Sequence, residues 1–112
     1  MQLIYVSGPL TGGDQRENVR TAMAEAAKLR DAGRDYAVLV PHLNWFFEMA
    51  HPCPEELCLQ MDFEVVKRCD IVLRIPGVSH GGDRETALAE SLNIPVFYGT
   101  AEEFLSRTRE QS

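Results

Sequence analysis

The order of strand-like and helix-like segments is the feature that most constrains the fold of this chain. Short runs rich in β-branched and aromatic residues recur along it, and segments with helical periodicity or capping signals lie between them. The strand-like runs are QLIYVS (2–7), YAVLV (36–40), DIVLRIP (70–76) and PVFY (95–98). The helix-like segments run from about 15 to the stop signal at Gly33, from 55 to 69, from about 83 to 92 and from about 101 to 109.

Strands that alternate with helices at this spacing pair in parallel through right-handed crossovers, and such a sheet carries helices on both faces. We therefore expect a three-layer α/β fold, similar to flavodoxin or a Rossmann fold, with a parallel sheet of four to five strands. The 112 residues and their 45% apolar content are enough for one hydrophobic core. The prediction is a single domain spanning residues 1–112.

Charge and hydropathy disfavour several classes of partner. The net charge is −6, and the eleven Lys and Arg residues are scattered, which argues against a nucleic acid polymer or an anionic membrane surface. No apolar run approaches the roughly 20 residues of a membrane span, and no basic leader precedes the first strand. We expect a cytoplasmic protein that binds a small molecule.

The three cysteines predict free thiols. Cys53, Cys58 and Cys69 are odd in number and fit no paired-cysteine metal motif, which favours reduced side chains in a reducing compartment. The alternative is a zinc site built from His42 and His51 with two of these cysteines, but its spacing is irregular. We expect no metal and no cofactor.

Three loops are expected to form the ligand site, because ligands of parallel sheets bind beyond the carboxyl ends of the strands. They are residues 8–14, 41–54 and 76–82. The middle loop is rich in aromatic residues without a clear period, which indicates a loop or a broken short helix. The other two are glycine-rich turns before helices, where free N–H groups suit a phosphate, although tight turns alone explain such glycines equally well. Neither loop has the spacing of a dinucleotide-binding or ATP-binding motif.

Two acidic residues fall on helix faces that the pattern predicts to be buried. Asp62 shares its face with cysteines and valines four residues before it and three, four and seven residues after it. Glu85 heads a face that continues with Leu88, Ala89 and Leu92. A carboxylate at the edge of a core is costly unless hydrogen bonds or an opposite charge offset its desolvation, so each requires an explanation.

A structural and a functional explanation compete. If Gly82 is the N-cap, Glu85 occupies the third helical position and caps the helix, and Asp62 forms a buried ion pair with Arg84 or Arg74. The functional explanation covers both carboxyl groups: one stays ionised at a helix N-terminus, and the other keeps its proton to pH 7 in apolar surroundings. Such a pair suits glycosidic chemistry, with a nucleophile and a general acid.

Three motifs resemble the nucleoside 2-deoxyribosyltransferase-like superfamily. They are IYVSGPLTGG near the start, MDFEVVKRCDIVLRIPG in the middle and SHGGDRETALAESLNIPV after it. The resemblance extends from residue 4 to residue 98, and its most specific part is Ser79, Gly81 and Glu85 following Asp62 and Asp70. The superfamily includes a branch of 2'-deoxynucleoside 5'-phosphate N-hydrolases and small uncharacterised bacterial and phage proteins.

The resemblance implies roles for particular residues. Glu85 matches the glutamate that attacks the anomeric carbon of the sugar, Asp62 the aspartate that assists departure of the base, and Tyr5 a tyrosine near the nucleophile. In the hydrolase branch, Ser79 matches a serine that helps hold the 5'-phosphate, and Asp70 is structural. The other candidate substrate contacts are Ser7, Gly8, Gly12, Gly81 and Gly82, together with Trp45 from the aromatic loop. Trp45 either stacks on the base or packs on the core.

Two departures from the transferases favour hydrolysis. True deoxyribosyltransferases carry an aspartate in place of Ser79 and an asparagine near the C-terminus that a neighbouring subunit donates, whereas residues 99–112 contain no asparagine. We therefore expect cleavage of the N-glycosidic bond of a nucleoside or deoxynucleoside 5'-monophosphate through a covalent glycosyl–glutamate intermediate. The alternatives are a 2-deoxyribosyltransferase, a nucleotide-binding or sensing module without turnover, and a structural accessory protein.

The resemblance also implies a homodimer or a higher homo-oligomer. The second long helix supports this expectation independently, because Leu59, Phe63 and Val66 form one apolar stripe beside another that contains Met61 and Val65. A helix that is apolar over so much of its circumference requires a second packing partner. We expect self-association through this helix.

Overall fold

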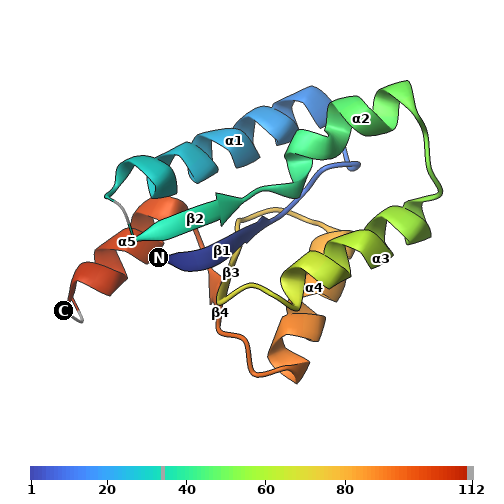
Figure 1. Cartoon of the computed structure of the whole chain (residues 1–112). Helices are drawn as coiled ribbons and strands as arrows, with labels where there is room; N and C mark the ends of the chain where they lie inside the picture. The colour runs from blue at the N-terminus through green and yellow to red at the C-terminus, as the bar shows by residue number, and fades with distance from the viewer. Residues whose placement is uncertain (34, 111–112) are drawn as a thin grey trace.

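A four-stranded parallel sheet forms the middle layer of the computed structural model, which describes residues 1–33 and 35–110 (Figure 1). The strands lie in the order β2-β1-β3-β4 and are β1 (Gln2–Ser7), β2 (Tyr36–Leu39), β3 (Ile71–Arg74) and β4 (Val96–Tyr98). The α-helices are α1 (Gln15–Asp31), α2 (Trp45–Ala50), α3 (Glu55–Val66), α4 (His80–Ser91) and α5 (Ala101–Glu110), and a short 3-10 helix, η1 (Pro41–Asn44), precedes α2. The expected three-layer α/β fold with a parallel sheet is confirmed.

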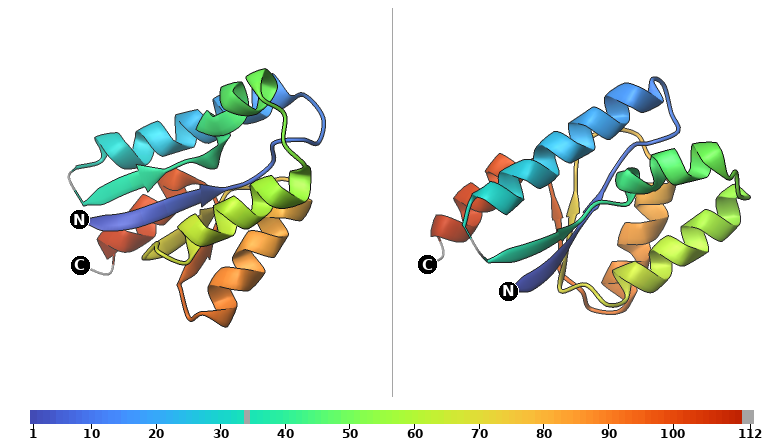
Figure 2. Two further views of the ribbon diagram at one scale, coloured as in Figure 1. Left: turned by 45° about the vertical axis from the view of Figure 1, so that its right-hand side comes forward. Right: turned by 45° about the horizontal axis from the view of Figure 1, so that its top comes forward.

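The alternation of side chains along β1 divides the core between the two faces of the sheet. Ile4 and Val6 are fully buried in a cluster with residues of α1 and α5, whereas Tyr5 packs on the other face with residues of α3 and α4. Figure 2 shows these two helix pairs on opposite sides of the sheet. Ser7 shares the face of Tyr5, so β1 presents two polar groups to α4.

Two helix boundaries differ from the expected ones. The second long helix ends at Val66 rather than Cys69, because tight turns follow it and lead to Asp70, whose carboxylate accepts the N–H of Leu3 at 2.7 Å. Helix α4 begins at His80 rather than near Asp83. The segment after β2 forms η1 and α2, which matches the expected broken short helix.

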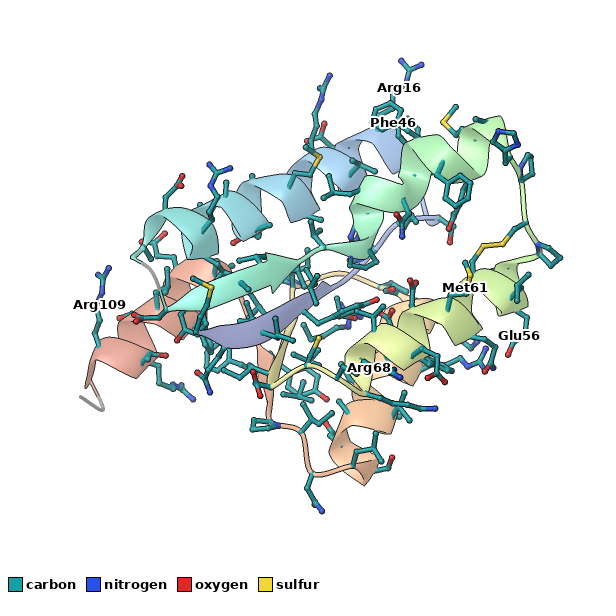
Figure 3. All side chains as sticks on the ribbon, in the orientation of Figure 1. Arg16, Phe46, Glu56, Met61, Arg68 and Arg109 are labelled. Atoms are coloured by element: carbon teal, nitrogen blue, oxygen red, sulfur yellow. A yellow bond between two sulfur atoms is a disulfide. The ribbon has the colours of Figure 1, made fainter. Side chains whose placement is uncertain are left out.

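The prediction of three free thiols is wrong for two of them. Cys53 and Cys58 form a disulfide, drawn as the yellow bond in Figure 3, and only Cys69 is a free, buried cysteine. The pair forms because the residues just before α3 lie against its first turn. The argument for a reducing compartment from free thiols therefore loses its basis.

The alternative zinc site does not form among the described residues. Across residues 1–33 and 35–110, no three His, Cys, Asp or Glu side chains come together as a metal-binding cluster. Among the same residues, no helix has the length and apolar character needed to cross a membrane.

A candidate active site at the carboxyl edge of the sheet

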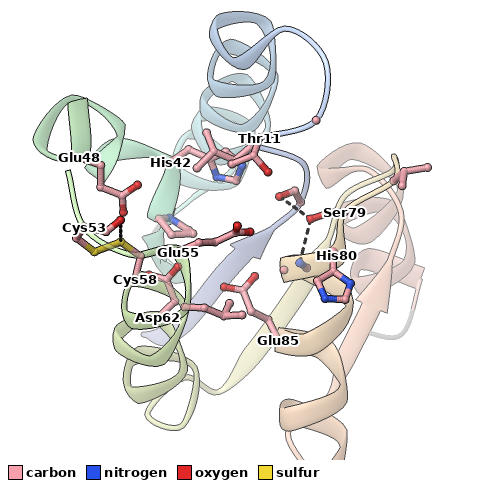
Figure 4. Close-up of a pocket in the computed structure, with 18 residues that line it drawn as sticks. Thr11, His42, Glu48, Cys53, Glu55, Cys58, Asp62, Ser79, His80 and Glu85 are labelled. Carbon is pink, nitrogen blue, oxygen red and sulfur yellow. Dashed lines mark hydrogen bonds between the residues drawn. A yellow bond between two sulfur atoms is a disulfide. The ribbon is translucent and has the colours of Figure 1, made fainter.

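The three loops at the carboxyl ends of the strands meet around one cavity of about 480 Å³ (Figure 4). Its wall comes from the loop after β1, from η1 and α2, from α3 and the segment that leads into it, and from the β3–α4 loop and the first turns of α4. The expected convergence of these loops is thus confirmed. Asp62, Ser79, Gly8, Gly12, Gly81, Gly82 and Glu85 all line this cavity.

Glu85 reaches the cavity from the second turn of α4 and is only 5% exposed. Its Oε2 accepts a hydrogen bond from the hydroxyl of Tyr5 at 2.5 Å, and its Oε1 accepts one from the hydroxyl of Ser7 at 2.8 Å. Burial raises the pKa of Glu85, while these two hydrogen bonds and the positive charge of Arg74 oppose the rise. The carboxylate is therefore fixed in orientation but costly to keep ionised.

The capping explanation for Glu85 is wrong. The N-cap of α4 is Ser79, and Glu85 is six residues after it, beyond the first turn. The acidic residue in the first turn is Asp83, which is exposed. Among the described residues, no backbone N–H at the start of α4 donates a hydrogen bond to Glu85. Its burial is therefore explained by the hydroxyls of Tyr5 and Ser7 and by the cavity.

Tyr5 and Ser7 support Glu85 rather than line the cavity. Both are buried, at 1% and 0% exposure, and they lie two positions apart on β1, on the face that α4 covers. Burial and the neighbouring Glu85 charge raise the pKa of Tyr5, so the phenol stays protonated and acts as a donor. Of the predicted site residues, these two contact the candidate nucleophile and not the cavity.

Asp62 extends from α3 into the same cavity and is half-buried. Burial raises the pKa of Asp62 to about 7, and the nearby charges of Glu85 and Glu48 contribute to the rise. Within the described part of the chain, no hydrogen bond or ion pair involves its carboxyl group. Figure 4 shows the side chains of Asp62 and Glu85 turned toward the same space between α3 and α4.

The ion-pair explanation for Asp62 is also wrong. Both proposed arginines have other partners: Arg84 binds Glu56 at 2.7 and 2.9 Å, and Arg74 binds Asp83 at 3.2 Å. Asp62 therefore lies on an apolar helix face without a cation to offset its charge. The remaining explanation for its position is the cavity itself.

Ser79 joins two of the loops that form the cavity. Its Oγ accepts the N–H of Gly82 at 2.9 Å as the N-cap of α4, and it donates to the carbonyl of Gly8 at 3.3 Å. The hydroxyl thus braces its own turn and the loop after β1. This is the structural alternative to a phosphate contact, and it uses both the donor and an acceptor site of the hydroxyl.

Replacement of Ser79 tests this bracing role. We expect Ser79→Ala to lower the free energy of unfolding by about 1 kcal/mol, because the N–H of Gly82 loses its cap. Ser79→Thr keeps the hydroxyl and should stay close to the parent protein. Urea unfolding measures both variants, and equal stability of Ser79→Ala and the parent would contradict the capping role.

Two of the predicted glycine contacts have packing reasons that need no ligand. A Cβ at Gly8 would collide with Cγ1 of Ile75, and a Cβ at Gly82 would lie 2.9 Å from Nε of Arg74. Gly12 has open space around it, and a Cβ at Gly81 would make only ordinary contact with Leu59 at 3.8 Å. Gly12 and Gly81 are thus the glycines that leave room at the cavity wall.

Trp45 does not line the cavity, so its predicted base contact is not supported. Its Nε1 donates to Oε1 of Gln15 at 3.0 Å, and its ring lies edge-on to Phe46 with centroids 5.0 Å apart. It joins α2 to the start of α1. The packing alternative describes Trp45 better, because its indole N–H finds a partner outside the site.

Two residues of the cavity wall, His42 and Glu48, fall in the predicted 41–54 loop but were not predicted individually as substrate contacts. His42 is buried, and its Nε2 lies 2.9 Å from the carbonyl oxygen of Pro9, while burial lowers its pKa and favours the neutral ring. Glu48, on α2, adds a carboxylate near Asp62. No spacing signal marks either residue, because both reach the cavity only through the path of η1 and α2.

The cavity is acidic. Four carboxyl groups line it, those of Glu48, Glu55, Asp62 and Glu85, and the lining residues in the described chain include neither Lys nor Arg. A ligand that carries hydroxyl or amino donors suits this wall better than one with several negative charges.

Comparison with known proteins gives a family and a related fold. A family model described as "Domain of unknown function (DUF7768)" matches residues 2–99. No curated protein matches the chain. Among solved structures, the chain is similar to a 2-desoxiribosyltransferase from Leishmania mexicana, with a TM-score of 0.61 and 18% sequence identity over 88% of this chain. The chain spans 63% of the length of that structure, and the likeness at this identity shows a shared fold.

Proposed function

The chain belongs to the family of domains of unknown function DUF7768, and we propose that its cavity cleaves the N-glycosidic bond of a nucleoside or deoxynucleoside. In the proposed reaction Glu85 is the nucleophile, Asp62 is the general acid, and water is the final acceptor of the sugar. The observation that carries the proposal is the presence of two carboxyl groups with different surroundings in one cavity. Glu85 is held by two hydroxyls, and Asp62 has no hydrogen-bond or ion-pair partner among the described residues and a pKa of about 7.

The first step forms a covalent intermediate. A carboxylate oxygen of Glu85 bonds to the anomeric carbon of the sugar, and the bond from that carbon to the base nitrogen breaks. The electron pair of the broken bond goes to the base, which takes the proton of Asp62. Asp62 can donate near neutral pH because burial and two neighbouring carboxylates keep its pKa close to 7.

The second step releases the sugar. Asp62, now ionised, takes a proton from a water molecule whose oxygen attacks the anomeric carbon, and the bond to Glu85 breaks. Both carboxyl groups return to their starting protonation states. Tyr5 and Ser7 hold the departing carboxylate through the same hydrogen bonds that orient it beforehand.

The acidic lining of the cavity affects whether its substrate carries a 5'-phosphate. The sequence favours a 5'-monophosphate through Ser79, but that hydroxyl already bonds Gly82 and Gly8, and no Lys or Arg side chain lines the cavity in the described chain. The N–H groups at the start of α4 are the remaining donors for an anion. These facts favour the unphosphorylated substrate, with the monophosphate as the alternative.

The decisive experiment is a panel of nucleosides and deoxynucleosides, each with and without a 5'-phosphate. Free base is measured by chromatography after incubation with the protein, in the absence and presence of a second base as acceptor. Release without an acceptor supports a hydrolase, and release that requires the acceptor supports a transferase. If no base appears while a compound raises Tm, a binding module replaces the enzyme in this proposal.

We also propose that the protein self-associates through α3. Leu57, Met61 and Val65 lie four residues apart on that helix and are 53%, 49% and 39% exposed, whereas Val66 faces the core. A continuous exposed apolar stripe of this kind favours a second copy as its cover. We expect a dimer by light scattering at micromolar concentration and a monomer for Met61→Glu. A monomeric parent protein would remove this proposal.

A further inference from the structure

A buried guanidinium lies between the end of β3 and the first turns of α4. Arg74 is the last residue of β3 and is 7% exposed. It donates to the carbonyl of Ile75 through Nη1, and through Nη2 to the carbonyl of Gly77 at 2.9 Å and to Oδ1 of Asp83 at 3.2 Å. Arg74 therefore fixes the β3–α4 loop, which ends in Ser79, and ties it to α4.

Arg74 lies on the same side of the sheet as Glu85. In the parallel pairing of β1 and β3, Arg74 is the partner of Ser7, and directly paired residues of adjacent strands project to the same face. Ser7 is the residue whose hydroxyl binds Oε1 of Glu85. Arg74 and Ser7 are therefore neighbours on adjacent strands, and both project from the face of the sheet that α4 covers.

The absence of a side chain at Gly82 makes room for this arginine. A Cβ there would lie 2.9 Å from Nε of Arg74 and 2.9 Å from Oγ of Ser79. Nε of Arg74 has no hydrogen-bond partner among the described residues, so the guanidinium is held by its two terminal nitrogens alone. A buried cation with incomplete hydrogen bonding is unfavourable unless a nearby negative charge compensates for it.

We propose that Arg74 is a positioning residue for the candidate nucleophile: its bonds to the β3–α4 loop and to Asp83 hold α4 over Ser7, and its buried charge favours the carboxylate form of Glu85. The inference rests on the proposed function for its catalytic meaning, whereas the electrostatic coupling of Arg74 to Glu85 is a property of the fold. Neither the glycosidic mechanism nor the sequence motifs assign a role to this arginine.

The charged and titratable groups around the two residues define the coupling. Glu85 accepts a hydrogen bond from Tyr5 of β1 and is influenced by the charges of Asp62 on α3 and Arg74 on β3, of which only that of Arg74 is positive. Arg74 in turn has Asp83 of α4 as a partial counter-charge, but that carboxylate is 73% exposed and well solvated. Glu85 therefore takes part in the neutralisation of Arg74, and Arg74 opposes the effect of burial on the pKa of Glu85.

The test is a titration of the Glu85 carboxyl carbon by NMR, with its signal assigned by its absence in Glu85→Gln. We expect Arg74→Gln to raise the titration midpoint by about one pH unit, a tenfold change in proton affinity, because the opposing charge is gone. Arg74→Lys should return the midpoint toward that of the parent without restoring both loop contacts. Turnover of Arg74→Gln should show the same displacement of its acid limb, whereas Arg74→Lys should keep the limb and lose rate.

The matched control is Arg84→Gln. This substitution also removes one positive charge, in this case from the first turns of α4. Because Arg84 binds the exposed Glu56, its loss should leave the titration midpoint of Glu85 unchanged. Asp83→Asn provides the opposite change, because Arg74 loses its partial counter-charge and the midpoint should fall. It also decides the question if both Arg74 variants fail to fold.

The outcomes separate this inference from the proposed function. A midpoint that stays constant in the folded Arg74 variants, or in Asp83→Asn if they unfold, overturns the inference even if the protein is an active enzyme. A midpoint that moves as expected supports it, even if no base is released from any nucleoside and the proposed function fails.

Discussion

Glu85→Gln is expected to abolish base release, with a loss of at least about a thousandfold in kcat/KM, because an amide cannot form the covalent bond to the sugar. The fold should persist. The amide oxygen of glutamine can still accept one of the hydrogen bonds from Tyr5 and Ser7, and the variant no longer has to bury an ionisable group whose pKa is raised by burial. Chromatographic measurement of free base, with circular dichroism as a check on folding, gives the result.

Two observations sharpen this test. Glu90→Gln changes an exposed glutamate of the same helix and should release base as fast as the parent protein, which controls for net charge. Mass spectrometry of the parent after rapid acid quench should find the sugar on the peptide that contains Glu85. If Glu85→Gln retains the parent rate, or if the sugar is found on another residue, the nucleophile is misassigned.

The fold was predictable because local signals agreed with the topology. The bounds of β1 match the predicted run, and α1 begins at Gln15 as expected, with Asp14 capping it by accepting the N–H groups of Arg16 and Glu17. The start of α4 was not predictable, because two consecutive glycines are poor helix formers and suggested a later beginning. Tertiary contacts stabilise the earlier start. Ser79 caps the helix, and the lack of a side chain at Gly82 leaves space for Arg74.

Local pattern alone made the candidate site predictable where it depends on periodicity or on the loops at the strand ends, whereas Tyr5 and Ser79 were expected from the resemblance. Helix-face spacing identified Asp62 and Glu85 as carboxyl groups on apolar faces, and neither of the structural explanations offered for them survives. Alternation along a strand puts Tyr5 and Ser7 on one face, but no local pattern says that this face lies under Glu85. Arg74 and Glu48 depend on the register of strands and on the path of α2, which are properties of the assembled fold.

The sequence also did not predict the partners of residues in the segment between β2 and α3. Cys53 and Cys58 were assigned as free thiols from an odd count and an unusual spacing, although five residues of separation are enough for a bond at the start of a helix. For Trp45 the sequence left open stacking on the base or packing, and its indole N–H bonds Gln15 on α1, which fits the packing alternative. In both cases the partner is set by the turn that precedes the helix, and that turn carries no motif.

Asp62→Asn is expected to lower the rate of base release by about a hundredfold to ten-thousandfold and to change its pH dependence. The active form of Asp62 holds a proton, and its pKa is about 7, so the rate of the parent protein should fall as the pH rises through about 7. The variant lacks this group and should show no such alkaline limb. Glu64→Gln, an exposed change on the same helix, should keep both the rate and the limb. An alkaline limb that persists in Asp62→Asn would assign the general acid to another residue.

The same substitution should stabilise the protein at alkaline pH. The pKa of Asp62 is raised from 3.8 in the unfolded chain to about 7 in the folded one, so between these values the native state binds more protons than the unfolded state. Stability from this group therefore falls as the pH rises through that window, and the full cost is present above it. Asparagine removes the cost, so Tm of the variant should equal that of the parent at pH 4 and exceed it by a few degrees at pH 8. Because a carboxyl group retained for packing alone would not impose this cost, a gain in Tm together with the loss of rate would indicate that Asp62 is kept for chemistry rather than stability.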